Sequence, residues 1–78
     1  MAKVFYRKLG ESMKNARSGG GLTQQDVADR LNMSRSTITC WETGARAINI
    51  DDLIKYCDVI NANVNDVLAP VRKFTYKK

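Results

Sequence analysis

Two helix signals that stand only three residues apart constrain this chain more than any other feature of its sequence. The stretch TQQDVADRL, residues 23–31, begins with a threonine that can cap a helix, and an aspartate follows three positions later. Residues 34–42 follow almost at once, and Ser34 is a second cap residue. Two helices joined by residues 32–34 cross steeply instead of lying antiparallel. The sequence therefore predicts two short helices on either side of a tight turn.

Further helix signals lie on both sides of this pair. Residues 4–18 carry apolar side chains at helical spacing, and the glycines that follow favour a turn. Asn49 and Asn63 each stand three positions before an aspartate, a spacing typical of helix starts. Pro70 is expected to end the last helix, because proline cannot continue one. The pattern predicts five short helices in an all-α fold.

These signals divide the chain into one domain, over residues 1–69, and a basic tail over residues 70–78. The tail is expected to form a short strand, a dimerisation arm or a disordered segment. Inside the domain, helical spacing assigns one apolar face to each helix. The predicted core residues are Phe5 or Tyr6, Leu9, Met13, Ala16, Val27, Ala28, Leu31, Met33, Ile38, Trp41, Leu53, Ile54, Cys57 and Ile60.

Positive charge is concentrated toward the two ends of the chain, which has a formal net charge of +5. Residues 1–46 hold eight Lys/Arg and four Asp/Glu, whereas residues 47–68 hold one Lys and four Asp. The last ten residues, 69–78, hold four Lys/Arg and no acid. Basic segments of this kind indicate an anionic partner, with nucleic acid ahead of a membrane surface.

Several functional classes lack the residues that they require. The chain has no His and two Cys, which cannot form a closed zinc site, and the usual general base of enzymes is missing. The stretch GGGLT lacks the lysine of a phosphate-binding loop. We therefore expect no enzymatic activity, no metal, no cofactor and no small-molecule ligand. No signal peptide or membrane span is visible, so a cytoplasmic protein with reduced thiols is expected.

The second helix of the closely spaced pair leaves one face free for a partner. Ile38 and Trp41 stand three positions apart and are expected to face the core. The opposite face carries Arg35, Ser36, Thr39 and Cys40, with Thr37 towards the side. Small side chains allow close approach to a surface, and an arginine can donate two hydrogen bonds to guanine in the major groove. The pattern predicts a helix-turn-helix unit with a recognition helix over residues 34–42.

Residues 22–68 resemble the Cro/phage-repressor class of helix-turn-helix domains, often called XRE-type. The matching features are Thr-Gln at the start of the second helix, Ala28 at the crossing, Ile38 in the core, WE-x-G at Trp41, Glu42 and Gly44, and the closing VNDVL. The opening LGESMKNAR also resembles the family's first helix. This resemblance implies a compact five-helix lambda-repressor-like domain. The chain departs from the family pattern at Asn32, Ile48 and Cys40, where Gly, Pro and a polar base reader are more usual.

The resemblance also implies roles for individual residues. Base-reading positions match Arg35, Ser36, Thr39 and Cys40. Gln24 matches a residue that contacts a DNA phosphate, which agrees with the attraction of helix N-termini for phosphates. Phosphate contacts are also expected for Ser34, Thr37 and Arg46. Arg17 and Glu42 match a pair that forms a salt bridge between helices.

The function that follows is a sequence-specific double-stranded DNA-binding transcriptional regulator, expected to be a repressor that binds a palindromic operator as a homodimer. Two half-sites multiply the discrimination that one recognition helix provides. The expected dimer interface comprises Val64, Val67, Leu68, Val71 and Phe74, with Tyr76 beyond them. A phage or mobile-element repressor, a restriction–modification controller and an antitoxin-like autoregulator all fit. A protein-interaction module of the same fold, without its own DNA readout, is the alternative from another class.

Overall fold

A computed structural model describes the backbone of residues 2–74 and the side chains of residues 3–73. Its elements in chain order are α1 (Ala2–Gly19), α2 (Gln24–Leu31), α3 (Arg35–Thr43), α4 (Ile50–Val59), α5 (Val64–Leu68) and a 3-10 helix, η1 (Ala69–Phe74). No strand occurs within residues 2–74. The predicted all-α, five-helix fold is confirmed.

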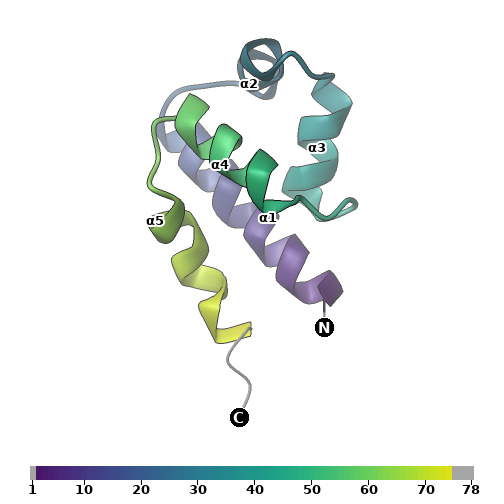
Figure 1. The fold of residues 1–78 in the computed structure, drawn as a ribbon, viewed down its shortest axis with the longest axis vertical. Helices are drawn as coiled ribbons and strands as arrows, with labels where there is room; N and C mark the ends of the chain where they lie inside the picture. Colours follow the sequence, from purple (N-terminus) through teal and green to yellow (C-terminus); the bar gives the residue numbers. More distant parts are fainter. Residues whose placement is uncertain (1, 75–78) are drawn as a thin grey trace.

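Helix α1 runs through the middle of the molecule and packs against α3, α5 and η1 (Figure 1). Helices α2 and α3 pack against each other at one end, where α2 is seen nearly end-on while α3 runs down the view. They therefore cross steeply, as the short connection predicted. Helix α4 packs against α2 and α5 and reaches α1 through the Tyr56 hydroxyl, which is hydrogen-bonded to the Met13 carbonyl, and α5 with η1 follows α1 on the side away from α3.

Local capping explains where the short helices begin. Thr23 and Asp26 form the capping box at α2, with hydrogen bonds of 3.0 and 2.9 Å between each side chain and the other's backbone N–H. Ser34 accepts from the Thr37 N–H at the start of α3. Asn49 caps α4 in the same way. These predicted helix starts are confirmed.

The ends of α2 and α3 depend on left-handed backbone conformations. Asn32 has a φ of 57° and Gly44 a φ of 79°. Asn tolerates this region better than other residues with a side chain, and Gly carries no Cβ that would clash there. Both residues stand at the C-terminal end of a helix.

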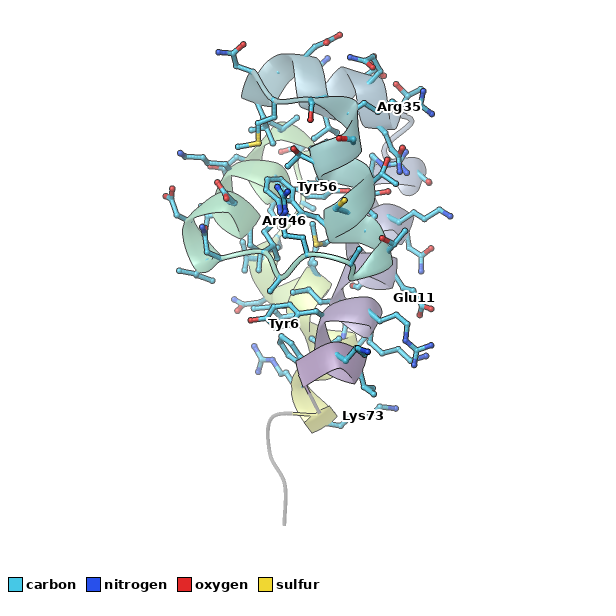
Figure 2. The ribbon with its side chains drawn as sticks, turned by 90° about the vertical axis from the view of Figure 1, so that its right-hand side faces the viewer. Tyr6, Glu11, Arg35, Arg46, Tyr56 and Lys73 are labelled. Carbon is cyan, nitrogen blue, oxygen red and sulfur yellow. The ribbon has the colours of Figure 1, made fainter. Side chains whose placement is uncertain are left out.

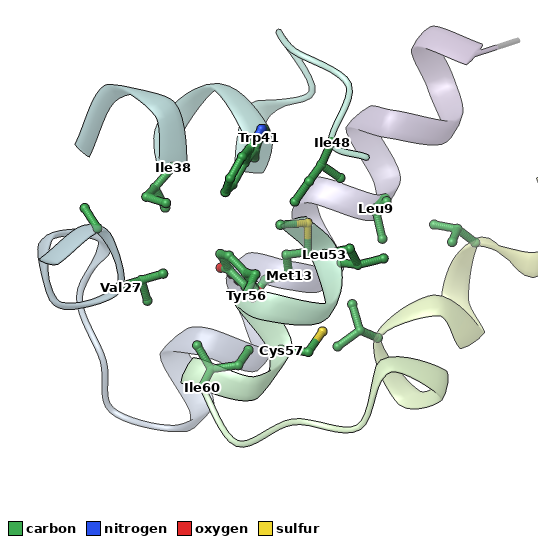
Figure 3. Packing of buried hydrophobic residues seen from close by; sticks show 13 residues of the cluster. Leu9, Met13, Val27, Ile38, Trp41, Ile48, Leu53, Tyr56, Cys57 and Ile60 are labelled. Carbon is green, nitrogen blue, oxygen red and sulfur yellow. Dashed lines mark hydrogen bonds between the residues drawn. The ribbon is translucent and has the colours of Figure 1, made fainter. Parts of the chain in front are cut away.

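Thirteen buried hydrophobic residues from every element form one core (Figure 3). Most belong to the predicted set, with one exchange on α4. Ile54 was expected in the core but is 45% exposed, and Tyr56 takes the buried place. The tyrosine is preferred because its ring fills the core while its hydroxyl meets a buried partner, described below.

The C-terminal part of the described chain differs from expectation. Helix α5 ends at Leu68, before Pro70 as predicted, but the chain continues through Pro70 as the 3-10 helix η1. Proline is tolerated in the first turn of a helix, where its missing N–H is not needed. The tail is therefore helical, not a strand, as far as Phe74; the rest of it lies outside the described residues.

Two residues expected at a dimer interface are core residues instead. Val67 and Val71 are 2% and 1% exposed, because α5 and η1, which carry them, pack against α1. The Ser12 hydroxyl donates a 2.6 Å hydrogen bond to the Val67 carbonyl, which ties α5 to α1. The prediction for these two residues is corrected. Phe74 and Tyr76 fall outside the described side chains.

Candidate nucleic-acid interface

Helix α3 shows one face to solvent, and the predicted reading residues share it. Arg35 and Ser36 are exposed, and Thr39 and Cys40 are half-buried. Thr37 is half-buried at the side, as expected. Figure 2, which faces α3, shows Arg35 and Arg46 on opposite sides of the helix. The exposed face therefore combines small hydrogen-bonding groups with a cation at each flank.

The only carboxylate of α3 does not contribute to this face. Glu42 is 4% exposed and turns inward, where Arg17 of α1 holds it through two hydrogen bonds of 2.7 and 2.9 Å. This is the salt bridge that the resemblance implied. The exposed face of α3 therefore carries no carboxylate. An anionic partner can approach this face without charge repulsion from the helix.

Glu42 accepts two further hydrogen bonds that sequence reasoning did not anticipate. Gln24 Nε2 donates to Oε1 at 3.0 Å, and the Tyr56 hydroxyl donates to Oε2. Helices α1, α2, α3 and α4 therefore meet at one carboxylate. We call Arg17, Gln24, Glu42 and Tyr56 the buried polar cluster.

The cluster determines the ionisation of its members. Burial alone would raise the pKa of Glu42, but the hydrogen bonds from Arg17, Gln24 and Tyr56 lower it below its ordinary value. Burial and the hydrogen bond to Glu42 raise the pKa of Tyr56. The hydrogen bond to Glu42 likewise raises the pKa of Arg17. At neutral pH the cluster is an ionised Glu42–Arg17 pair with a protonated tyrosine.

An ionised Glu42 also fixes the orientation of the Gln24 amide. A carboxylate can only accept hydrogen bonds, so the NH2 end of Gln24 must face it. The amide oxygen then points toward α3, where it accepts from the Thr39 hydroxyl at 2.9 Å and lies 3.5 Å from Arg35 Nε. Gln24 thus connects the buried cluster to the exposed face of α3.

The remaining predicted contact residues lie at the edges of this face. Ser34 is exposed at the N-terminal end of α3, and its hydroxyl lies 3.0 Å from that of Thr37. Arg46 is exposed in the loop after α3, and its backbone N–H donates to the Cys40 carbonyl at 3.2 Å. The structure therefore gathers all eight predicted base and phosphate residues around α3 and the N-terminus of α2.

Two residues near the site were missed by sequence reasoning. Thr43 is exposed four positions after Thr39, so helical spacing alone would have placed it on the same face. Tyr56 carries the only hydroxyl in the buried stripe of α4. That feature was a usable signal, because a buried hydroxyl needs a partner.

The predicted dimer residues are not brought together on one exposed surface. Val64 and Leu68 are half-buried on α5, whereas Val67 and Val71 are in the core. The large exposed apolar side chains are instead Ile50 and Ile54, at 63% and 45% exposure. Leu68 and Ile50 line one shallow hollow together with Phe5 and Tyr6.

The described residues, 2–74, contain neither a clustered metal site nor a membrane-spanning helix. No group of three or more acidic or cysteine side chains there is arranged to hold a metal ion. None of the helices in that part of the chain is both long and apolar enough to cross a bilayer.

Comparison with known sequences identifies the family. A helix-turn-helix family model matches residues 13–67. The HTH-type transcriptional regulator ImmR of Bacillus subtilis is 30% identical over 60 residues, covering 77% of this chain and 47% of that protein. An uncharacterized HTH-type transcriptional regulator of the same organism, YqaE, is 31% identical over 58 residues, covering 74% and 50%. The chain spans about half the length of these curated relatives.

Solved structures share the fold at lower identity. The clp gene regulator ClgR of C. glutamicum superposes with a TM-score of 0.83 at 22% identity, covering 95% of this chain and 96% of that chain. The restriction–modification controller protein C.AhdI of Aeromonas hydrophila gives 0.74 at 21% identity, covering 80% and 94%. Both curated relatives are named as HTH-type transcriptional regulators. The chain belongs to the XRE-type helix-turn-helix family of transcriptional regulators.

Proposed function

We propose that this protein binds a palindromic DNA operator as a homodimer and represses transcription from it. The observation that carries the proposal is the exposed face of α3, where Arg35 and Ser36 are exposed and the one carboxylate, Glu42, is turned inward. In the proposed complex this face enters the major groove, and Arg35 donates to a base edge. Ser36, Thr39 and Cys40 contact neighbouring base edges.

Phosphate contacts position the helix in the groove. Gln24 retains a second amide N–H beside the N-terminus of α2, where the helix dipole favours an anion. Ser34, Thr37 and Arg46 complete the phosphate set in this proposal. Two strands of phosphates, one near α2 and one near the loop after α3, would then flank the recognition helix.

The proposed dimer surface replaces the one expected from the sequence. Ile50 and Ile54 stand four positions apart on α4 and therefore share a face. Leu68 borders Ile50 through the hollow that both line, so the apolar surface extends to α5. Exposed apolar patches of this kind mark interaction sites. A second copy of the chain is the proposed occupant, because a palindromic operator requires a two-fold pair of recognition helices.

Repression follows from occupancy, since a dimer bound at an operator excludes other proteins from the same DNA. The proposal includes a cytoplasmic location in a bacterial or phage-infected cell, because the operator lies there. A reporter gene behind the selected operator tests the direction of control. Expression that rises when the protein is supplied would overturn repression and leave DNA binding intact.

Selection of bound duplexes from a random pool tests DNA binding itself. We expect a palindrome whose half-sites are centred about 10 base pairs, or a multiple of that, apart. Arg35→Ala should weaken binding to the selected site by about 1–3 kcal/mol and leave binding to random DNA nearly unchanged. Gln24→Ala should weaken binding to both duplexes.

Two outcomes would change the proposal. If Arg35→Ala weakened binding to every duplex equally, Arg35 would be a phosphate contact and not a base reader. If the native chain bound no duplex even at low salt, the protein-interaction alternative would replace DNA binding, because phosphate contacts strengthen as salt falls.

A further inference from the structure

We infer that a basic stripe on α1, formed by Lys3, Arg7 and Lys14, binds DNA phosphates beyond those reached by α2, α3 and the loop after α3. We call these three residues the α1 stripe. The inference rests on the proposed function and extends the DNA-contacting surface to a helix that nothing above assigned to it. It follows from how closely α1 approaches the end of α3.

Two glycines allow that approach. A Cβ on Gly10 of α1 would lie 2.5 Å from the Trp41 carbonyl oxygen, a distance that real side chains do not adopt. A Cβ on Gly44 would lie 2.6 Å from Arg7 Cα. The backbones of α1 and of the α3 C-terminus are therefore in direct contact. The side of α1 that carries Gly10 must face α3.

Helical spacing places the α1 stripe next to this contact. Gly10 lies seven positions after Lys3, three after Arg7 and four before Lys14. These offsets place all three basic residues within about 60° of Gly10 on the helix surface. Arg17, seven positions after Gly10, confirms the direction because it reaches Glu42 of α3 at 2.7 Å. Figure 2 shows α1 emerging beside the lower end of α3 on the face that carries Arg35.

The α1 stripe is available for an external anion. Lys3, Arg7 and Lys14 are exposed, and none has an ion pair or side-chain hydrogen bond within residues 3–73. The one acid of α1, Glu11, lies between Arg7 and Lys14 on the helix surface, and Lys8 pairs with it at 3.6 Å. Every DNA duplex presents phosphates at regular intervals. Unpaired cations beside a recognition helix can bind these phosphates.

Salt dependence measures the contribution of the α1 stripe directly. Binding of the full chain to its selected duplex and to a random duplex is measured at several salt concentrations, for native protein and for Arg7→Gln and Lys14→Gln. Each phosphate contact contributes about 0.9 to the slope of log K against log salt. Each variant is expected to lower the magnitude of the slope by about that amount. It should weaken binding to the selected duplex and to the random duplex by the same factor.

Lys8→Gln is the matched control, because it removes the same charge from the neighbouring residue on the side of α1 that faces η1. It should leave the slope closer to that of the native protein than Arg7→Gln does. Circular dichroism checks that each variant remains helical. Glutamine is a good helix former and none of the three positions is buried, so these variants are expected to fold.

Failure of this inference is distinguishable from failure of the proposed function. If the native chain binds its duplex but Arg7→Gln and Lys14→Gln keep the native slope, the α1 stripe is not a DNA contact. An equal fall in slope for Lys8→Gln would also overturn the inference, since the effect would reflect total charge. Absence of duplex binding by the native chain at low salt would overturn both.

Discussion

Glu42 occupies a position that is unfavourable for a carboxylate without partners. It lies in the last turn of α3, where the helix dipole is negative, and it is buried. Four hydrogen bonds from Arg17, Gln24 and Tyr56 offset that cost. Because these partners come from three other helices, the residue coordinates the arrangement of α1, α2 and α4 around α3.

Tyr56→Phe is the most selective test of the buried polar cluster. The substitution keeps the ring in the core and removes only the hydroxyl that donates to Glu42. We expect the free energy of unfolding to fall by about 1.5–3 kcal/mol, the range for hydrogen bonds to charged groups. Urea unfolding measures the difference.

Tyr6→Phe is the control for that experiment. Tyr6 is half-buried at the surface end of α1, and its hydroxyl has no hydrogen-bond partner among residues 3–73. Its removal should change the free energy of unfolding by less than about 0.5 kcal/mol. Equal losses of unfolding free energy in the two variants would mean that the Tyr56 hydroxyl does not donate to Glu42 in solution.

The buried polar cluster also shows how far single residues could be predicted. The Arg17–Glu42 pair follows from the family resemblance. Tyr56 and the inward side of Gln24 do not follow, because their partners lie 14 and 18 positions away in the sequence. Helical spacing indicates which face a residue occupies on its own helix, but not which side chain of another helix lies opposite.

At the scale of elements, the end of α3 combines a backbone requirement with a packing requirement. Gly44 has a φ of 79°, and the space for a Cβ is occupied by the backbone of Arg7. Gly44→Ala should therefore cost about 1–2 kcal/mol for the left-handed conformation, and about 1–3 kcal/mol more for the overlap with α1. Denaturant unfolding measures the sum.

Gly21 separates the two contributions. Its φ is also 79°, but no atom lies within 4 Å of the position that a Cβ would take. Gly21→Ala should lose only the conformational part, about 1–2 kcal/mol. Equal losses of unfolding free energy in the two alanine variants would mean that α1 can move away from α3 at no cost. The close contact would then not constrain the fold.

Element boundaries could be predicted where contacts between residues close in the sequence determine them. They were less predictable where contacts with distant residues decide. Thr23, Ser34 and Asn49 start helices through bonds to the residue three positions ahead, so the sequence alone reveals them. The choice between Ile54 and Tyr56 for the core of α4 depends on Glu42, which belongs to α3. The helical path through Pro70 depends on packing against α1, which no pattern in the tail indicates.

At the scale of the whole molecule, two surfaces have opposite character. The face around α3 is polar, with cations from α1, α3 and the following loop. The surface of α4 instead exposes Ile50 and Ile54, beside the Lys55–Asp51 ion pair. A monomer gains nothing from exposing two isoleucines on one helix face, whereas a dimer that buries them would place two copies of α3 on one duplex.

Ile50→Glu/Ile54→Glu tests this arrangement, because two carboxylates on the proposed dimer surface would face their own copies across a two-fold axis. We expect the native chain to sediment as a dimer and the double variant as a monomer with native helical content. Asn15→Glu/Ser18→Glu, which adds the same charge to exposed positions of α1, should remain dimeric. A native chain that sediments as a monomer both free and on its selected duplex would overturn the dimer. If the double variant stayed dimeric, the dimer interface would lie elsewhere than on α4.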